Sequence, residues 1–400
     1  MIDHTPAPPQ AEVFKQSDTG NLIPLFLGAG ALGLLVSGIC AFIPSMRAQF
    51  AFSWLFAFMY FFTLVVGSLF WILVHHATDA EWSVVVRRVL ENVAGLIPIV
   101  FIFFLPLLLC APILWKWWTI LPHADALLDK KRWYLNHGFF VLRVVLYFIG
   151  LTYVALSLKR NSTRQDADGN PGYTVAMRKL GIAGIPIFAL SLTFGAVDWL
   201  MGLDYKWAST MWGVYIFAGA AGSSMSLLVL IITALRNKGY LANVVTLEHY
   251  HIMGKLMFAF SVFWAYIGFS QYMLIWYANI PEETSYFIRR NVESWWWLSL
   301  FLVIGRFFLP FMLLLLQWTK KVPKVLCCVA GWIVFMQLVD LYVVIMPMLH
   351  KEGFSPSFLD LFALLAIGGP LGYLFLRALS QHNLIPLRDP RLQVSLHLTN

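Results

Sequence analysis

Long apolar stretches separated by short polar ones dominate the pattern along this chain. A helix needs about 20 mainly apolar residues to cross the hydrocarbon of a bilayer, and ten stretches reach that length. The expected spans cover residues 22–43, 50–74, 94–114, 136–159, 180–200, 211–235, 250–277, 294–317, 325–348 and 358–379. The pattern therefore predicts an all-α integral membrane protein of about ten transmembrane helices.

The polar stretches define the expected domain organisation. We expect a polytopic membrane domain over residues 21–380, with polar tails at 1–20 and 381–400. The first tail lacks the basic region and small-residue cleavage site of a signal peptide. Residues 161–172 (NSTRQDADGNPG) are the one stretch expected to form a flexible hydrophilic connection.

Composition supports the membrane assignment and excludes a soluble enzyme. Hydrophobic residues make up 60% of the chain and charged residues 12%, whereas a soluble domain carries roughly 25% charged residues. The mean hydropathy is +0.73. The bilayer is therefore the main solvent for this polypeptide.

Lysine and arginine positions predict the orientation. An even number of spans puts both termini on one side, and that side carries 17 Lys and Arg residues against 9 on the other, with Arg143 and Arg306 inside spans. Positively charged loops stay in the cytoplasm, so both termini are expected there, in a bacterial inner membrane protein. Topology and attraction to anionic lipid headgroups account for the net charge of +8, and no nucleic-acid partner is expected.

Cysteine and histidine positions give no expected metal site. Cys40, Cys110, Cys327 and Cys328 all lie in apolar stretches and form no CxxC motif. All ten histidines fall in loops or at the ends of expected spans, so haem b ligation between helices is not expected. We predict no cofactor bound covalently or by Cys or His ligands in this chain.

Polar residues near the ends of spans are the first candidates for function. A charge at the bilayer centre costs about 2.5–3.5 kcal/mol on insertion scales, so polar groups inside spans need a reason. Several gather at the outer face, which is the side opposite the termini. These outer candidates are His137, Asp198, Trp199, Asp204, Gln271, Tyr272, Glu282 and Glu283. For Asp198 the sequence favours a functional role.

One stripe of the seventh span combines aromatic and polar side chains. Trp264, Gly268, Gln271 and Tyr272 recur at i, i+4, i+7 and i+8, so they share one face of a helix, which we expect to face other helices. An aromatic wall with a few donors suits a flat quinone ring, and a carboxylate nearby can exchange its protons. An aromatic belt with capping and loop hydrogen bonds is the equally open alternative.

Two charged residues lie deeper, in the eighth and ninth spans. Arg306 and Asp340 differ in depth by about 6 Å at 1.5 Å per residue, so we expect them to pair between neighbouring helices. The pair is either a structural ion pair or part of a proton relay. At the inner face, His249 lies in a cluster with Glu248 and His251, which is either a proton entrance or a solvated interfacial group.

Small residues form one face of the sixth span. Gly219 and Ser223, and likewise Gly222 and Ser226, are four residues apart. This small-xxx-small spacing predicts close helix packing.

Three motifs resemble a known membrane family. They are AVDWLMGLDYKWASTMWG at 196–213, GKLMFAFSVFWAYIGFSQYMLIWYANIPEET at 254–284 and VDLYVVIMP at 339–347. The chain resembles the polysulfide-reductase (NrfD-like) membrane family, and within it the second large membrane subunit of bacterial alternative complex III. The resemblance runs through spans one to ten in order.

The resemblance implies a fold and a role. The implied fold is two four-helix bundles, at approximately 50–200 and 211–348, flanked by two peripheral helices. The implied role is in a quinol:electron-acceptor oxidoreductase that oxidises menaquinol or ubiquinol, in a subunit without its own redox centre that supports quinol oxidation and proton translocation.

The same resemblance implies partners and site residues. The implied partners are a homologous NrfD-like membrane subunit, an iron–sulfur protein, multihaem and monohaem cytochrome c subunits that hold the clusters and haem c, a terminal oxidase, and lipids. Arg306 departs from the family, whose members often carry histidine there, and arginine cannot relay protons as histidine does. The residues that match the family motifs are Asp198, Trp199, Asp204, Gln271, Tyr272, Asn279, Glu282 and Glu283.

Two other functions remain open from the sequence. A secondary transporter also has about ten spans and buried charges, but it tends to have broken helices at corresponding positions of two halves. The prolines inside the expected spans show no such pairing. A purely structural subunit that anchors peripheral partners is the other alternative.

Overall fold

The computed structural model describes residues 11–399 and is helical, with ten helices long and apolar enough to cross a membrane. Among these residues no β-strand is formed, and an isolated antiparallel bridge joins Val13 to Asn383. The ten candidate spans are Leu22–Phe42, Pro44–Ala77, Glu81–Leu109, His137–Asp168, Gly172–Asp204, Trp212–Asn237, Leu247–Ala278, Ser294–Leu315, Pro323–Met348 and Phe358–Leu379. The prediction of an all-α membrane protein with about ten spans is confirmed.

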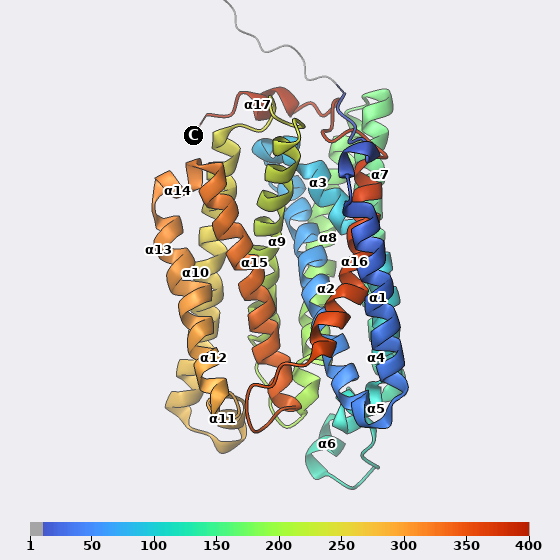
Figure 1. Cartoon of the computed structure of the whole chain (residues 1–400), viewed down its shortest axis with the longest axis vertical. Coiled ribbons are helices and arrows are strands. Elements are labelled where there is room, and N and C mark those ends of the chain that lie inside the picture. The colour runs from blue at the N-terminus through green and yellow to red at the C-terminus, as the bar shows by residue number, and fades with distance from the viewer. Residues whose placement is uncertain (1–10, 400) are drawn as a thin grey trace, which may run out of the picture.

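The long helices stand side by side along one direction (Figure 1). In the first half they are α1 (Leu22–Phe42), α2 (Arg47–Ala77), α3 (Val84–Ala94), α4 (Ile97–Leu109), α7 (His137–Asp168) and α8 (Gly172–Trp199). In the second half they are α9 (Trp212–Asn237), α10 (Leu247–Ala278), α12 (Ser294–Val303), α13 (Leu309–Leu315), α15 (Pro323–Ile345) and α16 (Phe358–Leu379). Short helices are α5 (Ala111–Leu114), α6 (Ala126–Lys131), α11 (Pro281–Ile288), α14 (Gln317–Lys321) and α17 (Leu392–Leu396).

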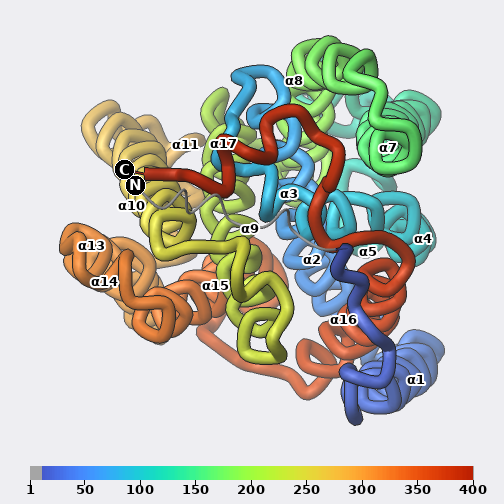
Figure 2. Tube along the Cα trace, turned by 90° about the horizontal axis from the view of Figure 1, so that it is seen from above, coloured from blue at the N-terminus to red at the C-terminus, as the bar shows by residue number. Residues whose placement is uncertain are grey.

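The helices pack as two bundles with a peripheral pair. In the first bundle α2 packs on α8 and α4, and α7 packs on α8 and α4. In the second, α9 packs on α10 and α15, α10 packs on α13, and α12 packs on α15. The bundles meet where α2 and α8 contact α9, and α1 packs against α16 beside α2 (Figure 2). This arrangement agrees with two bundles and two flanking helices.

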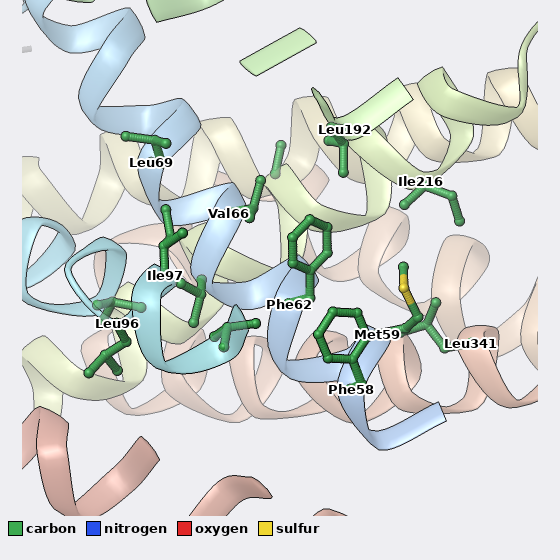
Figure 3. Close-up of a cluster of buried hydrophobic side chains, with 14 of the residues drawn as sticks. Phe58, Met59, Phe62, Val66, Leu69, Leu96, Ile97, Leu192, Ile216 and Leu341 are labelled. Atoms are coloured by element: carbon green, nitrogen blue, oxygen red, sulfur yellow. The ribbon is translucent and has the colours of Figure 1, made fainter. Parts of the chain in front are cut away.

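The core lies around α2, which is buried along most of its length. An apolar helix surrounded by other helices needs no polar face, which explains its continuous run of large apolar side chains. Figure 3 shows side chains from several helices meeting in this core. The labelled ones include Phe58, Phe62 and Leu69 of α2, Ile97 of α4, Leu192 of α8, Ile216 of α9 and Leu341 of α15.

Glycines let two pairs of helices approach closely. A Cβ at Gly67 of α2 would lie 2.3 Å from the carbonyl oxygen of Ala220 on α9, and one at Gly33 of α1 would lie 2.3 Å from the backbone nitrogen of Ala366 on α16. Helices in lipid associate through such close contacts. The small-residue face of α9 is also buried, but Gly219 faces the side chains of Gln337 and Arg306, and Gly222 faces Phe260. The close backbone approach on α9 is at Ala220 and not at the predicted glycines.

The prediction of a flexible hydrophilic connection at 161–172 is wrong. Helix α7 continues to Asp168, and the turn is confined to the residues around Gly169, which has a φ of 71°. The Gln165 side chain donates a hydrogen bond to Thr174 of α8 over 2.7 Å. Polar residues here mark where the apolar part of the helix ends, but the backbone stays helical because α8 pairs with it beyond that point.

The third span also differs from the prediction. It runs from Glu81 to Leu109 and bends near Gly95, between α3 and α4, so it begins and ends earlier than the predicted 94–114 and is longer. Arg87 and Arg88, which the sequence assigned to a loop, lie inside α3 and are buried. Their charges are paired inside the protein, as described below.

The described parts of both polar tails lie at one end of the molecule, which we call the inner end. The opposite end, with α6 and α11, is the outer end (Figure 1). Leu384 donates its N–H to the Glu12 carbonyl over 2.8 Å, and Ser395 donates to the Trp82 carbonyl over 2.9 Å. The tail predicted at 381–400 therefore folds back onto the helices. Residues 1–10 of the other tail, and residue 400, lie outside the described residues.

Candidate functional site

A cavity of about 650 Å³ lies towards the outer end of the second bundle. Its volume falls within the range of about 300–1,000 Å³ that is typical of small-molecule sites. Residues of α9, α10, α11, α12 and α15 line it, together with the loop before α9. The aromatic residues of the lining include Trp207, Trp212, Tyr215, Trp264, Tyr272, Tyr286, Phe287 and Trp296.

The chain reversal after α10 builds the outer wall of this cavity. Asn279 ends α10 in the left-handed conformation with a φ of 49°, and Pro281 then begins α11. The reversal carries Tyr286 against Trp207, and their rings stack with centroids 4.2 Å apart. Arg290 lies two residues beyond the end of α11 and also lines the cavity.

Arg290 is a buried cation held by carbonyl groups. Its guanidinium donates to the carbonyl oxygens of Val343, Val344 and Tyr286 over 2.9, 2.6 and 2.8 Å. It also lies over the Tyr286 ring, 3.4 Å from its centroid. Burial lowers the pKa of Arg290, but a guanidinium remains protonated in proteins. Burial raises the pKa of Tyr286 to about 12, so this tyrosine is neutral at physiological pH.

Asp340 is the acidic group of the lining. One of its oxygens accepts from the Tyr215 hydroxyl over 2.5 Å, and the other accepts from the Trp264 indole over 3.1 Å. The second oxygen also lies 3.5 Å from a terminal nitrogen of Arg306. The predicted pairing of Arg306 with Asp340 is therefore present.

Polar contacts continue from this pair to the first bundle. Arg306 donates to the side-chain carbonyl of Gln337 on α15, and the Gln337 amide donates to Thr63 of α2 over 3.3 Å. All of these side chains are buried. The network connects Asp340 in the cavity lining to α2, the central helix of the first bundle.

A π-helical turn at Ile304–Phe308 gives Arg306 its direction. Such turns insert an extra residue into an α-helix and occur often at functional sites. Here Arg306 points into the bundle, whereas Val303, Phe307 and Phe308 line the cavity.

The predicted stripe of the seventh span lies along the cavity. Trp264, Gly268, Gln271 and Tyr272 all line it. Trp264 and Gln271 are buried against other helices, as expected, whereas Tyr272 is 42% exposed. The side-chain amide oxygen of Gln271 accepts a hydrogen bond from the Ser209 hydroxyl over 2.6 Å.

The remaining outer candidates lie near the cavity without lining it. Asp204 forms an ion pair with Arg289 over 2.6 Å, beside Arg290 in the sequence. Glu282 is exposed and Glu283 is half-buried at the start of α11. The backbone carbonyl of Glu283 accepts from the Trp207 indole over 3.2 Å.

Asp198 and Trp199 belong to the first bundle and not to this cavity. Both carboxylate oxygens of Asp198 accept from Arg143 over 2.8 Å, and Tyr147 donates to the same carboxylate over 2.9 Å. Trp199 is fully buried in an aromatic cluster with Phe62 and other rings. Asp198 is thus held in a closed ion pair.

The two histidine candidates lie apart from the cavity. His137 is exposed at the start of α7, where its ring stacks on Trp118 with centroids 4.2 Å apart. His249 is buried at the inner end, and its ring nitrogen accepts from the Thr246 backbone over 3.1 Å. Its contacts complete a cap at the start of α10.

Sequence reasoning missed Arg290 and the aromatic residues around it. In the sequence, Arg290 contributes only to the nine charges on the outer side, and no motif marks it as a cavity residue. A second missed group lies at the inner end, where Arg87 pairs with Asp389 over 2.7 Å. No group of three or more His, Cys, Asp or Glu residues converges as a metal site within residues 11–399.

Comparison with known proteins adds no assignment. The chain matches no protein-family model and no curated protein sequence. The function is therefore argued from the cavity and its chemistry.

Proposed function

We propose that this chain is a membrane subunit of a quinol:electron-acceptor oxidoreductase in the bacterial inner membrane, with both termini in the cytoplasm. In this proposal the cavity of the second bundle takes the ring of a quinol or quinone. The observation that carries the proposal is an aromatic cavity with a few polar groups, part of whose apolar lining is exposed on the outside of the second bundle.

Exposure of the lining supports access from the membrane. Tyr266, Phe269, Val303 and Phe308 line the cavity and are still 64%, 64%, 46% and 48% exposed. They belong to α10 and to the eighth span, whose apolar outer surfaces would face lipid. A quinone, which is dissolved in the bilayer, could therefore enter between these helices with its tail left in lipid.

Polar groups in the lining support a ring with two oxygen atoms. Arg290 supplies donors at one end, and Gln271 lies on the α10 wall. Asp340 offers a carboxylate that could exchange protons with a ring hydroxyl. Aromatic walls such as Trp212, whose ring stacks with Tyr215 at 13° between planes, suit a flat ring.

The electron acceptors in this proposal belong to partner subunits, namely an iron–sulfur protein and multihaem and monohaem cytochrome c subunits beside a homologous membrane subunit. These partners follow from the sequence resemblance alone. Gentle solubilisation followed by identification of the copurifying proteins tests them. A solitary polypeptide would contradict the respiratory assignment.

A secondary transporter is less well supported. The helix breaks lie between α3 and α4, in the second helix of the first bundle, and at the π-turn before α13, in the third helix of the second bundle. Transporters typically break corresponding helices of their two halves.

A blocking variant tests the quinone site. A Cβ at Gly268 would make an ordinary contact with the Tyr215 ring at 3.4 Å, so Gly268→Phe should fold and fill the cavity. Gly28→Phe is the matched control because a Cβ at Gly28 meets nothing within 4 Å. With the full chain in lipid nanodiscs, a short-chain naphthoquinone should quench tryptophan fluorescence saturably. We expect Gly268→Phe to abolish this saturable quenching and Gly28→Phe to preserve it; equal quenching in both variants would contradict the proposal.

A further inference from the structure

Two charged residues line the cavity, and their surroundings differ. Asp340 already has its countercharge in Arg306, and both of its oxygens accept hydrogen bonds from Tyr215 and Trp264. Arg290 has only neutral partners, because among the described residues no carboxylate lies within ion-pair distance of it. The cavity therefore carries one positive charge without a countercharge.

The hydrogen-bond inventory of Arg290 leaves room for a ligand. A guanidinium has five N–H groups, and the three carbonyl contacts with Val343, Val344 and Tyr286 use one on each nitrogen. One N–H on each terminal nitrogen remains. Because Arg290 is only 5% exposed and lines the cavity, an oxygen of a bound molecule is the natural acceptor.

The neighbouring charged groups do not neutralise Arg290. Arg289 and Asp204 form their own ion pair over 2.6 Å outside the lining. Tyr286 and Tyr215 are neutral hydroxyl groups, and Tyr215 donates to Asp340. A buried cation without a paired anion is costly, so an anionic ligand would be stabilised at this end.

We infer that the Arg290 end of the cavity is an anion-selective subsite that takes one ring oxygen of the ligand in its ionised form. The inference rests on the proposed quinone site and adds the charge of the bound species. For a quinol, the O–H bond of one hydroxyl breaks, the electron pair stays on the ring oxygen beside Arg290, and the proton passes to water at the outer end. This step involves no change in oxidation state.

A pair of probe molecules tests the charge preference directly. The first is an alkylated hydroxynaphthoquinone, whose ring hydroxyl is ionised at neutral pH, and the second is its neutral O-methyl ether. A hydrogen bond to a charged partner is stronger than a neutral one, so the anion should bind the full chain in nanodiscs about tenfold more tightly than the ether. Saturable tryptophan quenching measures both affinities.

Variants assign the preference to Arg290. Arg290→Gln should reduce the tenfold ratio towards one, whereas Arg289→Gln, the neighbour outside the lining, should preserve it. Because Arg290 also binds backbone carbonyls, Arg290→Lys provides a second variant that retains the charge and should retain most of the preference. Equal binding of the two probes to the unmodified chain, or an unchanged ratio in Arg290→Gln, would overturn the inference while leaving the quinone site intact. Failure of both probes to bind would overturn the proposed function as well.

Discussion

Replacing Asp198 with Asn would leave the charge of Arg143 unpaired inside the first bundle. Both carboxylate oxygens lie 2.8 Å from guanidinium nitrogens, and the two side chains are 0% and 7% exposed. Removing one partner of such a buried pair typically costs about 3–5 kcal/mol of unfolding free energy. Asn still offers one acceptor, so we expect Asp198→Asn to cost about 3 kcal/mol.

A double variant separates the interaction between Asp198 and Arg143 from the effect of changing each side chain alone. Asp198→Asn combined with Arg143→Gln leaves no unpaired charge, so the double variant should regain most of the stability lost by the single one. Titration of the purified protein with SDS, followed by circular dichroism, measures the unfolding free energy. Lys321→Gln is the control, because the Lys321–Glu248 pair is partly exposed at 33% and 23% and should contribute less than about 1 kcal/mol.

Two results would refute this reasoning about Asp198. One is an Asp198→Asn variant as stable as the unmodified protein. The other is a double variant that loses the full sum of the two single effects. Measuring quinol oxidation and proton release separately in Asp198→Asn also tests its role: we expect losses no larger than the loss of folded protein, since the carboxylate lies outside the cavity.

Three further predictions concern packing, pH and topology. Gly33→Ala should lower the unfolding temperature, because its Cβ would lie 2.3 Å from the α16 backbone, whereas Gly38→Ala, with nothing within 4 Å, should not. Burial alone would raise the pKa of Asp389, but Arg87 and Arg391 outweigh it and hold the pKa well below its ordinary range. The stability that Asp389 contributes is therefore fully present above pH about 4 and is lost as the pH falls below it. Protease cleavage of the C-terminal tail should therefore increase in acid. In Asp389→Asn the tail should already be cleaved at neutral pH, and cleavage should increase much less in acid. In a cysteine-free background, a cysteine at Glu282 should react with an impermeant reagent from outside intact cells, and one at Arg164 should not; the reverse pattern would contradict the proposed orientation.

Hydropathy predicted the spans because lipid imposes a minimum apolar length on each helix. The depth of a residue in the membrane follows from its number of residues from the end of its span, and this is why the pairing of Arg306 with Asp340 could be expected. The stripe of Trp264 and Gln271 was predictable for a similar reason, since helical periodicity puts both on one face.

Two features could not be predicted in the same way: the rotation of each helix about its axis, and the contacts made by segments that fold back onto distant parts of the chain. Whether Asp198 faces Arg143 or the second bundle depends on how α7 and α8 are rotated, and hydropathy is nearly uniform around such helices. The pair Arg87–Asp389 joins residues 302 positions apart, through a tail that looked like a free polar end. Arg290 lies in a loop whose direction depends on the reversal after α10.

The two bundles each contain an arginine–carboxylate pair, and the difference between the pairs indicates their roles. Asp198 receives two hydrogen bonds of 2.8 Å from Arg143 and has no contact with the cavity. Asp340 is 3.5 Å from Arg306, whose nearest nitrogen has no hydrogen-bond partner among the described residues. A bidentate pair is fully satisfied and resists rearrangement. The looser pair beside the cavity can tighten or loosen at small cost when a ligand arrives, so under the proposed quinone function Asp340, and not Asp198, is the carboxylate expected to respond to the ligand.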